Sequence, residues 1–272
     1  MIDYIQGVQP HGALPFAMLF ASWPAWPLSS LETAWCALAL ALGYGVRGAA
    51  GFGSGVVVAP LLTFVMPLST VAPVITLLGL LVSLRQAVKD WFLIDWRRLA
   101  IFIPGSIVGV GLGVLAFKAV DPAALARWLG AYVLLYAFYS LFGERLLGRT
   151  LALPRWSAHP VAVVGALVAT LFGGLAGPIY VTYLDAQKLS KSVFRVTVST
   201  TLLVLGLLRS TAYLASGVFR AQDFLLVAGA LLPVAIGTLV GDRLHDRLDP
   251  AAFRKSVGVL LVASGIGLMI VH

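Results

Sequence analysis

The chain has 272 residues, of which 60% are hydrophobic and 11% are charged, with a mean hydropathy of +0.97 and a formal net charge of +8. Roughly a quarter of the residues in a water-soluble domain are charged, so this composition excludes an ordinary soluble enzyme. The apolar residues form continuous runs such as 101–120, and about 20 apolar residues span a bilayer as a helix. The strict alternation of a membrane β-barrel is missing from these runs. The composition therefore predicts an all-α polytopic membrane protein.

The first 30 residues differ from the rest of the chain. Residues 1–30 contain an apolar stretch that several prolines interrupt, and they carry Trp23 and Trp26 but no Lys or Arg. Tryptophan is enriched at the headgroup level of membranes. We therefore expect residues 1–30 to form an interfacial segment. Without basic residues, this segment does not resemble a secretory signal.

Residues 31–271 contain an internal duplication. One constant shift along the chain pairs Asp95 with Asp223, Gly109 with Gly237, Gly113 with Gly241, Asp121-Pro122 with Asp249-Pro250, and Gly130 with Gly258. The shift is slightly shorter upstream, where Thr76 pairs with Thr200 and Arg85 pairs with Arg209. The pairs predict two related halves, residues 31–143 and 159–271, joined by a basic linker over residues 144–158.

Each half is expected to form five apolar segments. In the first half they cover residues 31–50, 55–66, 70–88, 97–118 and 123–143. In the second half they cover residues 159–172, 177–186, 193–215, 223–244 and 251–271. The second segment of each half is too short to cross a bilayer upright, so we expect a broken half-helix there. The Asp-Pro pair that opens the last segment of each half is typical of a helix N-terminus.

The positions of Lys and Arg predict the orientation in the membrane. If the N-terminus lies outside, and the first two segments of each half make two crossings or a re-entrant hairpin, most of the 19 basic residues become cytoplasmic. These are Arg85, Lys89, Arg97, Arg98, Arg145, Arg149, Arg155, Lys188, Lys191, Arg195, Arg243, Arg247, Arg254 and Lys255. Only Lys118, Arg127, Arg209 and Arg220 lie outside, and Arg47 stays unassigned. If the two segments fused into one crossing, the basic residues would split evenly, which the positive-inside rule rejects.

This orientation predicts that the two halves are inverted relative to each other. The first half starts outside and ends inside, while the second starts inside and ends outside, so both termini are expected outside. Inverted repeats are common in secondary transporters, whose substrate site lies near the midplane where broken helices meet. The basic residues thus indicate membrane topology, and we expect no nucleic-acid partner.

A glycine-rich break separates the first and second segments of each half. It covers residues 51–55 (Gly-Phe-Gly-Ser-Gly) in the first half and residues 173–177 (Gly-Gly-Leu-Ala-Gly) in the second. A break at membrane depth is tolerated only where the backbone is buried in protein or faces a watery cavity. The helix that begins there points unpaired N–H groups and the positive end of its dipole at the cavity. The recurrence favours an anion site over the alternative, close packing of helices on small residues.

The duplicated pattern, with its Gly51-Phe52-Gly53-Ser54-Gly55 motif, a following Pro60 and a weaker copy around Gly173-Gly174 and Gly177, resembles the sulfite exporter TauE/SafE family, also called the toluene-sulfonate uptake permeases. The resemblance covers residues 31–271. It implies a secondary transporter in the inner membrane that moves a small organosulfur or organic anion, such as sulfite, sulfoacetate or a sulfonate. The sequence departs from the usual glycine run at Phe52, Ser54 and Leu175-Ala176, so the particular anion stays open.

The expected substrate site combines backbone donors, hydroxyl or amide groups, and guanidinium groups. Arg47 adjoins the first break, and Arg209 lies on the outer side of its segment, against the positive-inside trend. Guanidinium groups match the oxygens of carboxylate, sulfonate or sulfite. The candidate residues are Arg47, Gly51, Gly53, Ser54, Gly55, Thr76, Ser83, Gln86, Gly173, Gly174, Gly177, Ser199, Thr200 and Arg209.

Two other classes of function remain as alternatives. A ten-helix carrier of the drug/metabolite type also has inverted five-helix halves, but it would need carboxylates or aromatic walls to hold neutral or cationic solutes. An integral-membrane lipid enzyme would need a clustered nucleophile, base or metal set, which the sequence does not contain. A phosphate-binding loop is also missing from the sequence, so we expect no cofactor, no metal and no catalytic site. The direction of transport, the coupling ion and the oligomeric state stay open.

Overall fold

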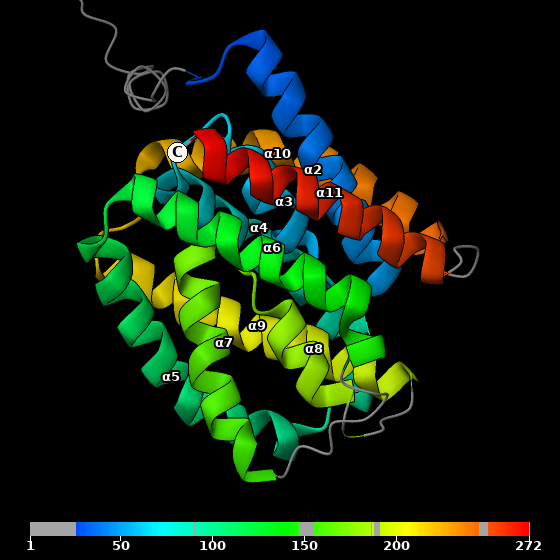
Figure 1. The fold of residues 1–272 in the computed structure, drawn as a ribbon. Helices are drawn as coiled ribbons and strands as arrows, with labels where there is room; N and C mark the ends of the chain where they lie inside the picture. Colours follow the sequence, from blue (N-terminus) through cyan, green and yellow to red (C-terminus); the bar gives the residue numbers. More distant parts are fainter. Residues whose placement is uncertain are drawn as a thin grey trace, which may run out of the picture.

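The computed structural model describes residues 26–89, 91–146, 155–185, 187, 191–244 and 250–271, and these residues form helices and no strand (Figure 1). The first half contains α2 (Ser30–Ala50), α3 (Ser54–Thr63), α4 (Leu68–Lys89), the 3-10 turn η1 (Trp91–Leu93), α5 (Trp96–Ala119) and α6 (Pro122–Leu146). The second half contains the 3-10 turn η2 (Arg155–Ser157), α7 (Ala158–Phe172), α8 (Gly177–Asp185), α9 (Lys191–Ala215), α10 (Ala221–Leu244) and α11 (Pro250–Val271). Most of the predicted interfacial segment, residues 1–25, lies outside the described residues.

The predicted segments correspond one to one with these helices, and most boundaries agree within two residues. The largest differences are at the ends of α3 and α6. α3 ends at Thr63, because Pro67 disfavours helix in the residue before it. α6 continues to Leu146, because Glu144, Arg145 and Leu146 favour helix. The expected N-terminal cap is confirmed in α6, where the Asp121 carboxylate accepts from the N–H groups of Ala123 and Ala124 at 3.0 and 3.2 Å.

The outer surface of the helices is apolar. Five helices, α4, α5, α6, α9 and α10, are long and apolar enough to cross a membrane within the described part of the chain. Large side chains such as Leu115, Leu232 and Ile270 are 68%, 70% and 78% exposed. Soluble monomers rarely expose contiguous apolar surface on this scale. The prediction of an all-α polytopic membrane protein is therefore confirmed at this level.

α2 and α3 form a helical hairpin. α2 begins with a capping box between Ser29 and Glu32 and ends at Gly51, where φ is 84°. Gly53, with φ of 95°, then starts α3. Glycine adopts these left-handed conformations without steric cost, so the chain reverses within three residues. α3 returns along α2, and a Cβ added to Gly43 would overlap Val58.

α7 and α8 repeat this arrangement in the second half. α7 ends at Gly173, with φ of 71°, and Gly174 also has a positive φ of 112°. α8 returns along α7, so that Gly165 lies against the ring of Tyr180. α3 and α8 have 10 and 9 residues, a rise of about 15 Å, which is half of a bilayer core. In both pairs the second helix therefore turns back along the first; a re-entrant position in the membrane stays a prediction.

Helices of one half pack mainly on helices of the other half. α2 packs on α10 and α5 packs on α7, and both pairs run parallel. In the first pair, for example, Gly237 faces Ala41 and Gly241 faces Gly45. In both pairs, the first helix of one half contacts the fourth helix of the other. Glycine at the contact lets the two backbones approach closely.

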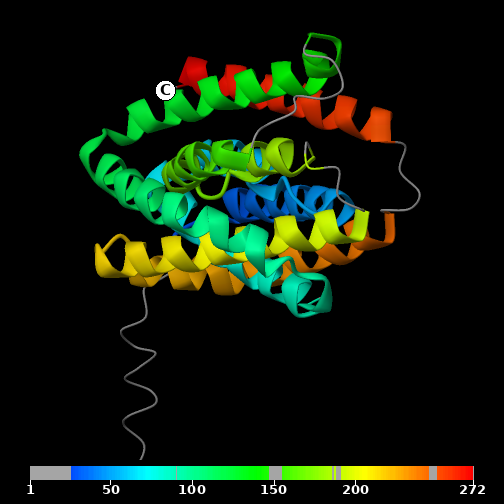
Figure 2. The same cartoon turned by 90° about the horizontal axis from the view of Figure 1, so that it is seen from below.

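The third helices of the two halves, α4 and α9, pack together, and so do the fifth helices, α6 and α11. α6 and α11 run antiparallel, because Gly130 lies near Gly265 whereas Leu141 lies near Gly258. α4 and α9 also run antiparallel, because Leu80 lies near Gly206 whereas Gln86 accepts from Ser199. Figure 2 shows α6 and α11 together on one outer face, and α9 and α10 on the opposite face. The two hairpins lie between these faces, so the glycine breaks are in the centre of the molecule (Figures 1 and 2).

Two glycines of α5 test the parallel packing of α5 on α7. A Cβ at Gly109 would overlap the carbonyl of Val163, whereas a Cβ at Gly111 meets nothing within 4 Å. We expect Gly109→Ala to lower the free energy of unfolding by about 1–3 kcal/mol, because an extra methyl group must push the helices apart. Gly111→Ala should leave it unchanged or raise it slightly. Thermal unfolding in detergent measures both variants, and equal melting temperatures would contradict this packing.

Candidate functional site

The two glycine breaks contact each other in the centre of the protein. A Cβ added to Gly55 would come within 3.0 Å of the carbonyl group of Gly174. A Cβ added to Gly177 would lie 3.4 Å from the Phe52 ring and 3.7 Å from the Gly53 nitrogen. Each break thus packs on the backbone of the other. A side chain at Gly55 would separate them.

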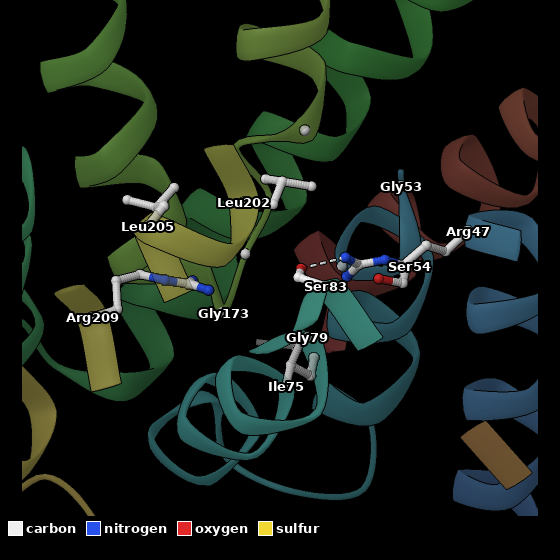
Figure 3. A pocket seen from close by; sticks show the side chains of 13 residues that line it. Arg47, Gly53, Ser54, Ile75, Gly79, Ser83, Gly173, Leu202, Leu205 and Arg209 are labelled. Atoms are coloured by element: carbon white, nitrogen blue, oxygen red, sulfur yellow. Dashed lines mark hydrogen bonds between the residues drawn. The ribbon is translucent and has the colours of Figure 1, made fainter. Parts of the chain in front are cut away.

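A small cavity lies between the two breaks, as Figure 3 shows. Its volume is about 20 Å³, on the order of what one water molecule requires. It is lined by Arg47, Gly53, Ser54, Gly55, Ile75, Gly79, Ser83, Gly173, Gly174, Gly177, Leu202, Leu205 and Arg209. The structure therefore brings together nine of the fourteen predicted site residues around one small cavity.

Arg47 reaches the cavity from the last turn of α2. Its side chain is buried, with 4% exposed, and Nη2 donates a hydrogen bond to the Ser83 hydroxyl on α4 at 2.6 Å. Its Nε has no hydrogen-bond partner among the described residues. A cation in this position interacts favourably with the negative end of the α2 dipole. The Nε–H of this guanidinium is therefore a buried donor that the described residues leave unused.

Arg209 reaches the cavity from α9, on the opposite side (Figure 3). It is also only 4% exposed, and Nη1 donates to the backbone carbonyl of Ala169 at 2.6 Å. That carbonyl belongs to the last turn of α7, where Gly173 donates to it as well. The Nε of Arg209, like that of Arg47, lacks a partner within the described part of the chain. Each glycine break therefore has one buried arginine beside it.

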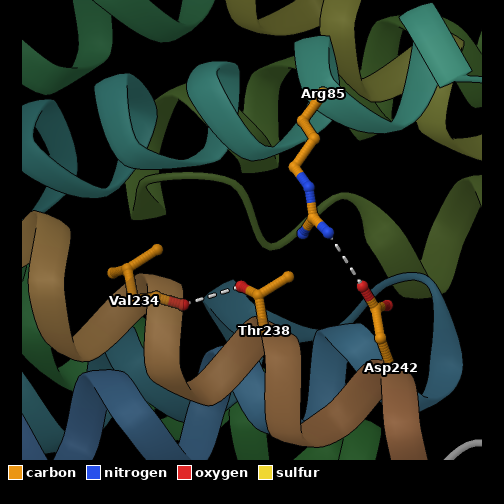
Figure 4. A network of polar contacts seen from close by, with 4 residues as sticks. All are labelled: Arg85, Val234, Thr238 and Asp242. Carbon is orange, nitrogen blue, oxygen red and sulfur yellow. Dashed lines mark hydrogen bonds and ion pairs between the residues drawn. The ribbon is translucent and has the colours of Figure 1, made fainter.

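The two arginines come from different positions of the duplication. Arg47 precedes Gly51 by four residues, and the residue at the matching distance before Gly173 is Ala169. The counterpart of Arg209 in the first half is Arg85, which instead forms an ion pair with Asp242 of α10 at 3.5 Å (Figure 4). This ion pair is partly exposed and lies near Thr238, whose hydroxyl donates to the Val234 carbonyl at 2.7 Å.

The cavity carries an excess of positive charge. Arginine stays protonated in proteins, and the guanidinium groups of Arg47 and Arg209 lie close enough to repel each other. None of the described residues that line the cavity is acidic. A buried charge without a counter-charge is costly, so this site is suited to an anion. A cationic solute, one of the alternatives above, would meet two positive charges here.

Five predicted site residues do not line the cavity. These are Gly51, Thr76, Gln86, Ser199 and Thr200. Gly51 caps α2, and the hydroxyls of Thr76 and Thr200 donate to the carbonyls four residues earlier in their own helices. The Ser199 hydroxyl donates to the Gln86 Oε1 at 3.2 Å and links α9 to α4. Their role in binding stays a prediction.

Several lining residues were not predicted from the sequence. Ile75, Leu202 and Leu205 form the apolar part of the wall, and nothing distinguishes them from other aliphatic residues in so apolar a chain. Gly79 makes room for Arg47, since a Cβ there would lie 3.7 Å from Nη1. Its spacing of four residues from Ser83 already indicates in the sequence that both lie on one helix face.

Tyr44 is a further polar residue that the sequence analysis missed. It is fully buried one turn before Arg47, on the same face of α2. Its hydroxyl lies near Ser54 and within electrostatic range of Arg47 and Arg209. No described residue forms a hydrogen bond with it. An unpaired buried hydroxyl costs about 1–3 kcal/mol, and the neighbouring Ser54, which lines the cavity, is a polar group that it can meet.

The described residues contain no group of three or more His, Cys, Asp or Glu side chains that could hold a metal ion.

Comparisons with known proteins find relatives of the chain. A family model described as "Sulfite exporter TauE/SafE" matches residues 35–268. The probable inner membrane transporter protein TsaS of Comamonas testosteroni is 28% identical over 179 residues, which cover 64% of this chain and 72% of that protein. The probable sulfite/organosulfonate exporter TauE of Cupriavidus necator is 27% identical over 227 residues, which cover 81% and 87%. No solved structure matches the chain significantly.

The unpaired hydroxyl of Tyr44 gives a direct test of the site. If the cavity binds an anion such as sulfite through Tyr44, Tyr44→Phe should lower the apparent affinity about tenfold, because a hydrogen bond to the anion is lost. The protein without sulfite should be equally stable or more stable, since an unpaired group is removed. Tyr213→Phe is the control, because the Tyr213 hydroxyl donates to the Thr170 carbonyl and its loss should lower stability instead. Thermal-shift titrations separate the two, and unchanged sulfite affinity in Tyr44→Phe contradicts the assignment.

Proposed function

The chain belongs to the sulfite exporter TauE/SafE family, and on that premise we propose that it is a secondary transporter of a small organosulfur or organic anion, such as sulfite, sulfoacetate or a sulfonate. The observation that carries the proposal is the pair of buried arginines in a cavity without an acidic residue among its described lining. Guanidinium groups bind the oxygens of sulfite, sulfonate and carboxylate with charge-assisted hydrogen bonds. The relatives named above are transporters by name, so a transport role also fits the family.

We propose that the anion binds between the N-termini of α3 and α8. Gly53, Ser54 and Gly55 would supply backbone N–H groups from one side and Gly177 from the other. Gly173 and Gly174 donate their N–H groups to the Ala169 carbonyl, so they would line the site and shape the turn. α3 supports this assignment because its N-terminus has no side-chain cap, which leaves its first N–H groups available to a ligand. Arg47 and Arg209 would supply the charge, and Ser83 and Tyr44 would add hydroxyl groups.

Gln86 and Ser199 are assigned to the path that leads to this site. They are hydrogen bonded between α4 and α9, and Gln86 lies one helical turn beyond Ser83. The Nε2 of Gln86 is buried and has no partner among the described residues, so it can donate to a passing anion. Gly51, Thr76 and Thr200 would not contact the anion. They would instead shape the turn and the helices around the site.

We propose that the halves 31–143 and 159–271 are inverted repeats, with a cytoplasmic linker over 144–158 and both termini outside. The antiparallel packing of α4 on α9 and of α6 on α11 supports this, because inversion turns equivalent helices in opposite directions. The exchange of first and fourth helices between halves is also what a two-fold axis between them would produce.

Transport would proceed by alternating access. The cavity of about 20 Å³ holds no more than about one water molecule, so an anion enters only when the helices around it move. The described conformation would then be a closed one that lies between the inward-open and outward-open states.

Removal of either buried guanidinium tests the proposed function. In proteoliposomes, Arg47→Gln and Arg209→Gln should each lower the initial rate of sulfite transport at least tenfold, since a charge-assisted contact is worth about 1.5–3 kcal/mol. Arg220→Gln is the matched control, because Arg220 is exposed and does not line the cavity, and it should transport at the wild-type rate. Absence of transport of sulfite, sulfoacetate and sulfonates by the wild type would overturn the function.

Single cysteines test the orientation. Cys36 is the only cysteine, so Cys36→Ser provides a cysteine-free background. In that background, Arg220→Cys should react with a membrane-impermeant maleimide in intact cells, because it lies in a predicted outer loop. Trp156→Cys, in the linker, should react only after the cells are permeabilised. Labelling of both from the same side, or in the reverse order, is incompatible with the proposed topology.

A further inference from the structure

We propose that the protein works as an anion exchanger, in which the carrier changes its open side rapidly with an anion bound and slowly when empty. The inference rests on the proposed transport function and adds the mode of transport to it. It follows from how the two buried arginines are compensated in the closed conformation.

The first observation is the concentration of charge in a closed space. Arg47 and Arg209 are each 4% exposed, lie on opposite sides of a cavity of about 20 Å³, and repel each other. Water that would screen this repulsion in an open conformation has little room in the closed one. The closed conformation therefore combines two like charges with low solvation.

The second observation is that only neutral groups of the described residues bind the two guanidiniums. Arg47 donates to the Ser83 hydroxyl and Arg209 donates to the Ala169 carbonyl, while both Nε atoms are unpaired. Tyr44, whose hydroxyl has no partner among the described residues, is a neutral neighbour of both charges. The site therefore has unused donors and an unbalanced charge in the closed conformation.

The ion pair between Arg85 and Asp242 provides an internal comparison. Arg85 occupies the position of the first half that corresponds to Arg209, and a carboxylate neutralises it at 3.5 Å. Its side chain is 54% exposed, so its need for a counter-ion is smaller than that of Arg209. The more buried arginine of the two thus has no acidic side chain on the cavity wall, which leaves the neutralising role to the cargo.

Both directions of alternating access pass through a closed state. With an anion bound, its negative charge offsets the guanidinium charges and its oxygens accept from their free N–H groups. Without an anion, the charges would be desolvated and unpaired, which is strongly unfavourable. A carrier whose site depends on a carboxylate can neutralise it by binding a proton and return empty. Arginine stays protonated and cannot be neutralised in this way. A second anion must therefore bind before the carrier changes its open side again.

The rate of efflux with and without an external anion tests this inference. Proteoliposomes containing the wild-type protein are loaded with ³⁵S-sulfite and diluted into unlabelled sulfite or into gluconate, with the membrane potential clamped. We expect efflux into sulfite to be at least tenfold faster than efflux into gluconate. Equal rates would overturn the exchange mode while leaving the transport function intact. Absence of efflux in both arms would overturn the transport function itself.

Variants with one guanidinium removed test the physical cause. Arg47→Gln and Arg209→Gln should transport more slowly, but the ratio of the two efflux rates should fall toward one, because the empty site carries less charge. Arg220→Gln should keep the wild-type ratio, since Arg220 is exposed and outside the cavity. If a Gln variant transports and keeps the full ratio, buried charge is not the cause. The wild-type comparison stands without the variants, so loss of folding in either one does not affect it.

Discussion

Two helices end in the middle of this membrane protein, and the backbone groups at those ends must be satisfied away from water. A lipid-exposed break would be too costly, so each break needs protein or a polar cavity beside it. The chain meets this requirement by packing the two breaks on each other, with Gly55 against Gly174 and Gly177 against Gly53. The hairpins, the central cavity and the glycines at the contact all follow from that arrangement.

The same arrangement concentrates polar chemistry at one point. Helix N-termini attract anions, and here two of them share a cavity with Arg47 and Arg209. The arginines also stabilise the fold, since Arg209 donates to the carbonyl of Ala169 at the end of α7. Binding and architecture thus depend on the same groups. A substitution at either arginine will change both, which is why stability must be measured alongside affinity.

Much of the fold could be predicted from the sequence, because long apolar runs, prolines and glycine breaks indicate helix boundaries locally. The position of the site was accessible for the same reason, since the breaks and Arg47 are adjacent in the chain. The packing partners of the helices could not be predicted. α2 packs on α10 through small residues, and such residues do not indicate which helix they contact. Tyr44 was missed because only the three-dimensional structure shows that its hydroxyl has no hydrogen-bond partner among the described residues. Thr76 and Thr200 do not line the cavity, and their hydroxyls donate to carbonyls of their own helices, which the sequence does not show.

The pairing of α2 with α10 also constrains how the protein is made. Among the described helices, α2 is synthesised first. α10, which contributes Gly237 and Gly241 to the contact with α2, is synthesised last but one. Until then, α3 and α4 can supply Val58 and Ser83 to α2, but the face of α2 that packs on α10 has no partner. The N-terminal half must therefore wait in the membrane in an incomplete state. Insertion of the first helices and assembly of the cavity are separate events, divided by the synthesis of most of the chain.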